Sequence, residues 1–414
     1  AETLRDSPSV LDDSLPTLAR VSKNCKKYHH ACMYVSSYLR LHLVRVSLSL
    51  SLVFGRPPAP STVPPRVGRG STRHTSPMDH AYVLCAAFPS SRGASEIRAT
   101  GNPAAVVVVE NDEEDDAGDF CRDESSTDDF QRVATSLNLS ETAFVRRGRE
   151  TAEEKERGTV RYFIRWFTPT CEIGLCGHAS VASAAAVLSA PEHADARAVR
   201  FEYASGSLTI ARDEDRFIME MKASAPEAFE GCEDVLKEIR DAFETNRETV
   251  RGAKFSCTRN AIGDTFLLIE KTDEGDGKDD DGGFGFRGVV QTYVSRAPDL
   301  KRIARVGGRG VCVVIPACGE RLSESEPDYV VRWFGPNVGI DEDPVTGSAC
   351  CGVTPLLSAR RSDTNSNSFM FGEQLSARTG HLWSRMKPDD AGKVQVAGRV
   401  IFTGEGIARH PYTT

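Results

Sequence analysis

Residues 175–188, LCGHASVASAAAVL, place a thiol, a glycine and an imidazole directly before a run of small and apolar side chains. A helix without a polar face is typical of a protein interior, so this run predicts a helix enclosed by other elements. Gly177 and His178 stand at its start, where backbone N–H groups lack partners and carry partial positive charge. We therefore expect this end of the helix to attract an anion such as a substrate carboxylate.

The chain contains a second copy of this unit. Residues 165–188, RWFTPTCEIGLCGHASVASAAAVL, and 332–357, RWFGPNVGIDEDPVTGSACCGVTPLL, share a strand ending in Arg-Trp-Phe, a proline turn, a glycine-bearing turn and a small, apolar run. Gly347 and Ser348 take the places of the glycine and histidine. Two copies predict two similar domains with a ligand site between them. The alternative interpretation is that the glycines only form tight turns.

The composition divides the chain into three parts. Residues 1–77 are a basic leader with no Asp or Glu between Ser14 and Pro77, which is typical of an organellar transit peptide. The alternative is non-native sequence upstream of the true start. We expect an N-terminal domain over 78–205 and a C-terminal domain over 206–414, with the last strand able to return to the first domain.

The leader also decides the expected compartment, which is a plastid or mitochondrion if it is a transit peptide and the cytoplasm if it is not. Its apolar segment 39–54, LRLHLVRVSLSLSLVF, is interrupted by Arg40, His42 and Arg45. Such a segment is too short and too charged to span a bilayer, so we expect no membrane partner.

The twelve cysteines are scattered along the chain rather than arranged as a disulfide framework, which favours a reducing compartment.

Charge and motifs exclude several classes of partner. The net charge of −8 argues against a nucleic-acid binder, because phosphate backbones are held by concentrated Lys and Arg. There is no glycine-rich dinucleotide fingerprint and no P-loop, so we expect no nucleotide cofactor. Cys171, Cys176 and His178 lack the paired C-x2-C spacing of a zinc site, so we expect no metal. A small molecule is the expected partner.

From Met78 onward the sequence changes to short β-branched and aromatic runs, such as NPAAVVVVE at 102–110 and VRYFIRWF at 160–167. These runs predict many strands and few long helices. Two acidic stretches, 110–129 and 271–285, contain too little apolar surface to pack, and we expect solvated loops there.

Candidate proton carriers occur near both helix starts. Glu141 follows Ser140 in LNLSETAFV and stands just before an apolar strand. Asp343 is the last residue of the acidic triplet in IDEDPVTGSA. By spacing alone, Glu141 reads as a surface charge, the triplet as helix capping and His178 as a structural histidine. The chemical alternative is that the carboxylates and the imidazole exchange protons with a substrate.

Several motifs occur together and in order: TGNPAAVVVV, NLSETAFV, the two Arg-Trp-Phe units, FEYASGSLTI, FGEQLSARTGHLWSR and VQVAGRVIFTGEG. Together they resemble the PhzF family of phenazine biosynthesis-like isomerases from Met78 to about Ala408. The resemblance implies an α/β (α+β) fold of two pseudo-symmetric domains, each a β-barrel wrapped around a central helix, similar to diaminopimelate epimerase. It also implies a homodimer with the active site between the domains.

The resemblance assigns roles to individual residues. Glu141 becomes the general acid/base that moves a proton between carbons without a cofactor, and His178 and Asp343 become its polar partners. The turns at Gly177 and at Gly347 and Ser348, which begin the two helices, become substrate-binding turns. The known activity of the family is isomerisation of a dihydro-hydroxyanthranilate, but a fold does not determine what fills its cleft, so the substrate is left as a small carboxylate-bearing metabolite.

Cys176 raises a further alternative, because related racemases and epimerases use two facing thiols. The matching position in the second copy is Thr346, a hydroxyl that we expect to have no activating base, so the two-thiol mechanism is not available. We interpret Cys176 as a structural cysteine. The remaining alternatives are a racemase that acts through Cys176 alone and a non-catalytic ligand-binding or scaffold protein on the same fold.

Overall fold

The computed structural model describes eight ranges of the chain: 80–90, 100–109, 120–124, 126–245, 252–272, 286–317, 326–361 and 368–408. The predicted leader, residues 1–77, lies outside these ranges, as do most residues of the two acidic stretches. The described end of the first acidic stretch corrects the expectation of a solvated loop. Phe120 is buried there, and the stretch ends in the first turn of a helix that begins at Thr127.

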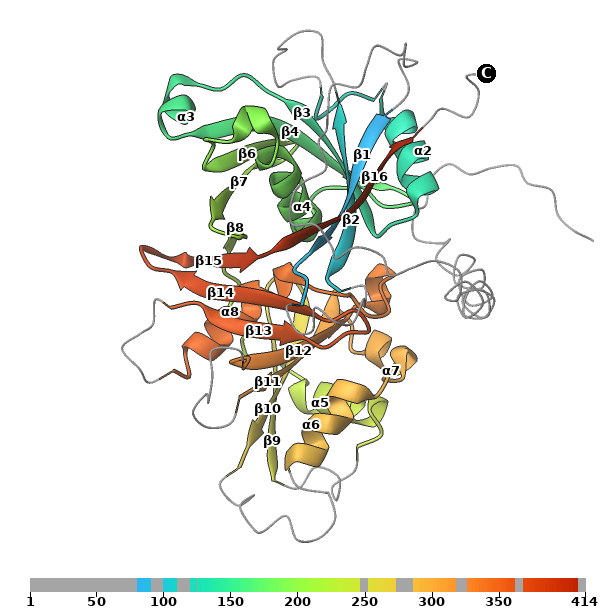
Figure 1. The fold of residues 1–414 in the computed structure, drawn as a ribbon. Coiled ribbons are helices and arrows are strands. Elements are labelled where there is room, and N and C mark those ends of the chain that lie inside the picture. The colour runs from blue at the N-terminus through green and yellow to red at the C-terminus, as the bar shows by residue number, and fades with distance from the viewer. Residues whose placement is uncertain are drawn as a thin grey trace, which may run out of the picture. The chain divides into compact units, whose positions relative to one another are not determined.

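The β-branched and aromatic runs form strands, which pair into one sheet (Figure 1). The strands in the described ranges are β1 (His80–Ala87), β2 (Asn102–Val109), β3 (Glu141–Arg147), β4 (Thr159–Phe167), β5 (Glu172–Ile173), β6 (Ala198–Tyr203), β7 (Gly206–Asp213), β8 (Arg216–Lys222), β9 (Ala253–Arg259), β10 (Asp264–Lys271), β11 (Gly310–Pro316), β12 (Tyr329–Phe334), β13 (Met370–Gln374), β14 (Gly380–Lys387), β15 (Asp390–Gly398) and β16 (Val400–Ala408).

Helices lie on both sides of this sheet. They are α2 (Thr127–Leu137), α3 (Ala152–Glu156), α4 (Gly177–Leu188), α5 (Cys232–Ala242), α6 (Phe286–Ser295), α7 (Leu300–Arg305) and α8 (Cys350–Ser358), with 3₁₀ turns η1 (Pro191–His193), η3 (Pro336–Val338) and η4 (Gly347–Ala349). The predicted small-residue helix is α4, and its counterpart in the second Arg-Trp-Phe unit is η4 followed directly by α8.

The strand pairing contains an internal repeat. Two sets of seven strands follow the same order of pairing, which is antiparallel, parallel, antiparallel, parallel, antiparallel, antiparallel. The first set is β1-β2-β3-β4-β6-β7-β8, and the second is β9-β10-β11-β12-β13-β14-β15. The two sets, called here the first and second halves, are joined where β8 pairs with β15. The last strand, β16, pairs with β1. This pseudo-symmetric α+β architecture is the expected fold class.

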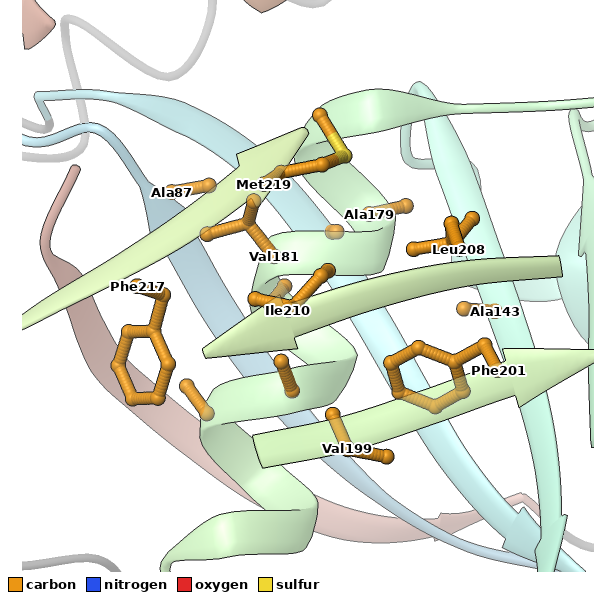
Figure 2. Close-up of a cluster of buried hydrophobic side chains, with 14 of the residues drawn as sticks. Ala87, Ala143, Ala179, Val181, Val199, Phe201, Leu208, Ile210, Phe217 and Met219 are labelled. Atoms are coloured by element: carbon orange, nitrogen blue, oxygen red, sulfur yellow. The ribbon is translucent and has the colours of Figure 1, made fainter. Parts of the chain in front are cut away.

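The strands of the first half surround α4. Figure 2 shows side chains of β6, β7 and β8 lying over this helix: Val199, Phe201, Leu208, Ile210, Phe217 and Met219. The small residues of α4 are almost completely buried, which allows the strands to approach the helix closely. Enclosure by strands accounts for a helix that has no polar face.

The opposite face of the sheet is buried as well. On β4, Ile164 and Trp166 point toward α4, whereas Phe163 and Phe167 pack with Phe130 of α2. In the second half, β11 divides its side chains in the same way between α8 and the layer of α5, α6 and α7. Burial on both faces explains why these strands read as continuous apolar runs.

The expected domain boundary at residues 205 and 206 falls in the tight turn between β6 and β7. Both flanking strands pack against α4, through Phe201 on one side and Leu208 and Ile210 on the other. The division into 78–205 and 206–414 stays a prediction.

Candidate active site

Glu141 and His178 meet at the start of α4. Glu141 is the first residue of β3, and His178 is the second residue of α4. The Nε2 atom of His178 lies 3.0 Å from Oε2 of Glu141. Both residues are buried, with 9% and 8% of their surface exposed. The interpretation of Glu141 as a surface charge is therefore wrong, because the parallel pairing of β3 with β2 brings its first residue under the helix.

The two side chains form an ion pair. Burial alone would raise the pKa of Glu141, but the charge of His178 and hydrogen bonds from His178, Ser140 and Cys176 lower it below its usual value. Burial alone would lower the pKa of His178, but its interactions with Cys176 and Glu141 raise it well above its usual value. Both shifts favour the charged forms of these side chains, a carboxylate and an imidazolium.

A buried polar atom without a partner lies near this pair. Among the described residues, Oδ1 of Asn102 has no hydrogen-bond partner, and Asn102 stands on the α4 side of β2, as Ala104 and Val106 do. Glu141 lies opposite Ala104, two residues from Asn102, so the Asn102 oxygen and the Glu141 carboxylate are at the same end of the strand pair. Buried polar atoms in proteins almost always have partners, and this unpaired oxygen is therefore a candidate contact for a polar ligand.

Cys176 is the N-cap residue of α4, and its side chain makes no capping hydrogen bond. Its Sγ atom lies 3.4 Å from Nδ1 of His178. Burial raises the pKa of Cys176, so the sulfur is present as a thiol, which is a poor base. The sulfur contacts Nδ1 of His178, whereas Nε2 of the same ring faces Glu141, and this favours a role in orienting His178.

Asp343 reaches the same region from the second half. Asn102 of β2 donates a hydrogen bond from Nδ2 to Oδ1 of Asp343 at 3.0 Å and another to the carbonyl of Val345. Burial raises the pKa of Asp343, although the His178 charge and the hydrogen bonds from Thr346 and Asn102 oppose that rise. Asn102 thus connects Asp343 to the strand pair that carries Glu141, and no direct bond joins the two carboxyl groups among the described contacts.

Thr346 corrects one expectation. Its hydroxyl donates to Oδ2 of Asp343, so this hydroxyl does have an adjacent base. Pro344 lies between them in a turn that brings residues three apart into contact. Gln374 of β13 completes the arrangement, because it accepts from the Thr346 backbone N–H at 2.8 Å and donates to the Asp343 carbonyl at 2.7 Å.

The glycines at the two helix starts do not need their special backbone freedom. Neither Gly177 nor Gly347 is among the described glycines with positive φ. A Cβ atom on Gly347 would meet Phe88 only at an ordinary 3.5 Å, and one on Gly177 would lie 3.2 Å from Met219. The tight-turn interpretation is therefore not required, and the substrate-binding role of both residues stays a prediction.

Ser348 is half-buried in η4, and its hydroxyl contacts Arg309, which precedes β11. Arg309, its partner Asp264, Asn102 and Gln374 were not predicted as site residues. Asn102 belongs to the motif TGNPAAVVVV but had no predicted role, and the other three carry no local signal because their partners lie tens of residues away in the chain. Alignment of the two repeated units, rather than the spacing of residues along the chain, was the signal that could have identified these four residues.

One metal donor set is present in the described residues. Glu141, Cys176 and His178 each offer a ligand atom within 4.8 Å of the others, and carboxylate, thiolate and imidazole are all ligands of zinc. Metal binding would require loss of the thiol proton, which burial of Cys176 opposes. The expected absence of a metal stays a prediction.

Residues 95–406 match the sequence profile of the PhzC-PhzF family, described as phenazine biosynthesis-like proteins. The chain belongs to this PhzF family. It is 29% identical over 310 residues to an uncharacterized isomerase of Pseudomonas aeruginosa, covering 75% of this chain and 93% of that relative. It is 31% identical to phenazine biosynthesis-like domain-containing protein 1 of Mus musculus, covering 74% of this chain and 93% of the relative.

A solved structure supports the same assignment. The crystal structure of a PhzF family protein of Enterococcus faecalis matches with a TM-score of 0.56 and 26% identity, covering 80% of this chain and all of that chain. The expected resemblance is confirmed, and the protein belongs to a family of PhzF-like isomerases. Within the described ranges, no helix has the length and apolar character needed to cross a membrane.

Proposed function

We propose that this protein is a cofactor-independent isomerase that moves a proton between carbon atoms of a small carboxylate-bearing metabolite, with Glu141 as the general acid/base. The observation that carries the proposal is the buried Glu141–His178 ion pair at the start of α4, near Oδ1 of Asn102, which has no partner among the described residues. Membership of a family whose relatives are named isomerases supports it.

The charge state of the pair suggests the order of events. The Glu141 carboxylate takes a proton from one carbon of the substrate and returns it to another. Because the pKa of Glu141 is lowered, it is a weak base and requires an acidified C–H, such as one next to an unsaturated or carboxylate-stabilised centre. The His178 imidazolium and the free N–H groups at the start of α4 stabilise the negative charge that develops on the substrate.

The other candidate residues fit this mechanism as binding groups. Asp343 supports the cleft opposite Glu141 through its bond with Asn102, and we propose that Gly177, Gly347 and Ser348 line the path of the substrate. We also propose a homodimer, as the family resemblance implies. Light scattering of the purified chain tests that assembly directly, because a single mass of twice 45.1 kDa is expected.

Solvent-deuterium incorporation tests the proton transfer. The full chain is incubated in heavy water with a small-metabolite extract, and products are analysed by mass spectrometry beside Glu141→Gln. The wild type should label or isomerise at least one metabolite, and Glu141→Gln should lose about a hundredfold or more of that rate, with nearly unchanged thermal stability.

Glu154→Gln is the matched control, because Glu154 is equally buried, at 9% exposure, but pairs with Arg161 instead of His178. It should label metabolites at the wild-type rate. Cys176→Ser separates the remaining catalytic alternative, since a single-thiol racemase would lose activity on this change. Absence of labelling with the wild type would instead favour a ligand-binding protein.

A further inference from the structure

Ser348 stands at the start of the second central helix, where its hydroxyl oxygen receives two hydrogen bonds from one side chain. Nη1 and Nη2 of Arg309 donate to Oγ of Ser348 at 3.2 and 3.1 Å. A hydroxyl has two acceptor lone pairs and one proton. With both lone pairs occupied by Arg309, Ser348 interacts with any further group only as a donor. No acceptor for its proton is found among the described residues.

Arg309 is itself held in place. Its Nε donates to Oδ1 of Asp264 at 2.8 Å, and its Nη2 bonds Oδ2 of the same carboxylate. Asp264 is fully buried, with 0% exposure, and also accepts from Nε1 of Trp333 at 3.2 Å. The guanidinium lies over the Trp333 ring, 5.1 Å from its centroid. Two hydrogen bonds to Asp264 and the contact with the Trp333 ring leave the guanidinium little freedom to turn away from Ser348.

The position of this cluster relates it to the proton carrier. Ser348 occupies in η4 the place that His178 occupies in α4, directly after the glycine, and α4 and η4 are neighbours. Among the described residues, no acceptor is found for the second N–H of Arg309 Nη1, and the Arg309 side chain is 30% exposed. The exposed side of the cluster therefore presents only hydrogen-bond donors and a positive charge.

Building on the isomerase function proposed above, we propose that Arg309 is a positioning residue that makes Ser348 an obligate donor to the carboxylate of the substrate. Asp264 anchors Arg309, Arg309 fixes Ser348, and the Ser348 hydroxyl donates to the anion. The proton carrier then stands on the first half, and the group that orients the substrate stands on the second. The site should bind a neutral amide more weakly than the carboxylate of the same shape, because charge-assisted hydrogen bonds are stronger than neutral ones.

A binding experiment on the full chain tests this without any turnover. The probes are acetate, crotonate and benzoate, each paired with its primary amide, and affinities are measured by ligand-observed NMR. For the acid that binds most tightly, the wild type should prefer acid to amide by about tenfold or more. Arg309→Lys keeps a cation beside Asp264 and so protects the fold, but it cannot fork onto Ser348, and the preference should fall at least about fivefold.

Non-additivity distinguishes positioning from a separate or merely structural role. If Arg309 acts through Ser348, then Arg309→Lys should reduce the preference no further in a Ser348→Ala background. Ser348→Thr, which keeps the hydroxyl, should retain most of it. The matched control is Arg161→Lys, since Arg161 forks onto Glu154 in the first half and should leave the preference unchanged.

Several results would overturn the proposal: no acid that binds the wild type, no preference for acid over amide, an unchanged preference in Arg309→Lys, or additive effects of the two changes. Glu141→Gln should keep the acid preference while losing deuterium exchange. An intact Arg309-dependent preference without any exchange in the wild type would remove the isomerase and leave the anion site. Deuterium exchange in the wild type, together with an acid preference that does not depend on Arg309, would keep the isomerase and remove the role of Arg309.

Discussion

The two halves of the sheet share a backbone plan but differ in chemistry at the helix start. Trp166 lies opposite Ala143 in the first half, and Trp333 lies opposite Cys312 in the second. Glu141 lies two residues before Ala143, and Gly310 lies two residues before Cys312. Glu141 in the first half therefore corresponds to Gly310 in the second. The first half therefore has a carboxylate where the second half has no side chain at all.

Packing explains why the second half has no counterpart of Glu141. A Cβ atom on Gly310 would lie 2.4 Å from the Trp333 ring and 2.7 Å from the Phe334 carbonyl. The carboxylate of this half instead belongs to Asp264, directly opposite Gly310 on β10, where it holds Arg309 rather than a histidine. The comparison teaches that a repeated fold preserves strand pairing while each half carries a different part of the site.

The largest expected effect tests the packing difference. Gly310→Ala should destabilise the protein by about 3 kcal/mol, because a methyl group cannot fit between the Trp333 ring and the backbone. Gly347→Ala is the control, since its Cβ has ordinary contacts and should cost less than about 1 kcal/mol. Urea denaturation of both variants measures this, and equal losses of stability would contradict the account of Gly310.

A smaller effect tests the hydrogen bonds of the two tryptophans. Trp166 donates to the neutral hydroxyl of Ser180 at 3.2 Å, and Trp333 donates to the carboxylate of Asp264. Trp→Phe removes the same ring volume in both halves, so the difference between the two variants reports on the acceptor. Because bonds to charged groups are stronger, Trp333→Phe should cost about 1 kcal/mol more than Trp166→Phe.

A double-mutant cycle between Trp333→Phe and Asp264→Asn checks the same bond independently. It should give a coupling of about 1 kcal/mol in the free energy of unfolding. A coupling near zero, or a greater loss in Trp166→Phe, would show that ring packing and not the charged acceptor separates the two halves.

The smallest expected effect concerns pH, since only the first half carries a titrating pair at its helix start. The pKa of Glu141 is lowered from 4.5, so its stabilisation is present above that value and is lost as pH falls through the folded pKa. The pKa of His178 is raised from 6.5, so its stabilisation is present below that value and is lost as pH rises through the folded pKa. The pair therefore contributes fully between these two ordinary values.

Urea denaturation from about pH 4 to about pH 9 measures this contribution. The difference in unfolding free energy between wild type and Glu141→Gln should be greatest between pH 4.5 and 6.5 and should shrink at higher pH. It should not exceed about 1 kcal/mol, because His178 can release its proton once residue 141 carries no charge, and because desolvation of the pair offsets its attraction. Ser348→Ala should give a difference that does not vary with pH, and a flat profile for Glu141→Gln would count against the ion pair.

Local sequence predicted the elements that depend on neighbouring residues. The β-branched runs became strands, and the small-residue run became α4, because periodicity and side-chain size act within one element. The repeat of the Arg-Trp-Phe unit predicted the pseudo-symmetric fold. The strands β9, β14 and β15 and the helices α5 to α7 were not predicted, because they carry mixed polar patterns with one partly exposed face. The strand β13 was not predicted either, because its pattern is mixed and polar although all five residues are buried.

For the site, the sequence by itself determined which chemical groups exist and, through the family motifs, which of them to examine: Glu141, His178, Asp343 and Ser348. Only the tertiary structure decided their partners. Strand register brings Glu141 to His178, and a fold-spanning contact joins Asp264 to Arg309, which lies 45 residues further along the chain. Burial then sets the charge states. Register, long-range contact and desolvation are properties of the packed chain, so no local pattern encodes them.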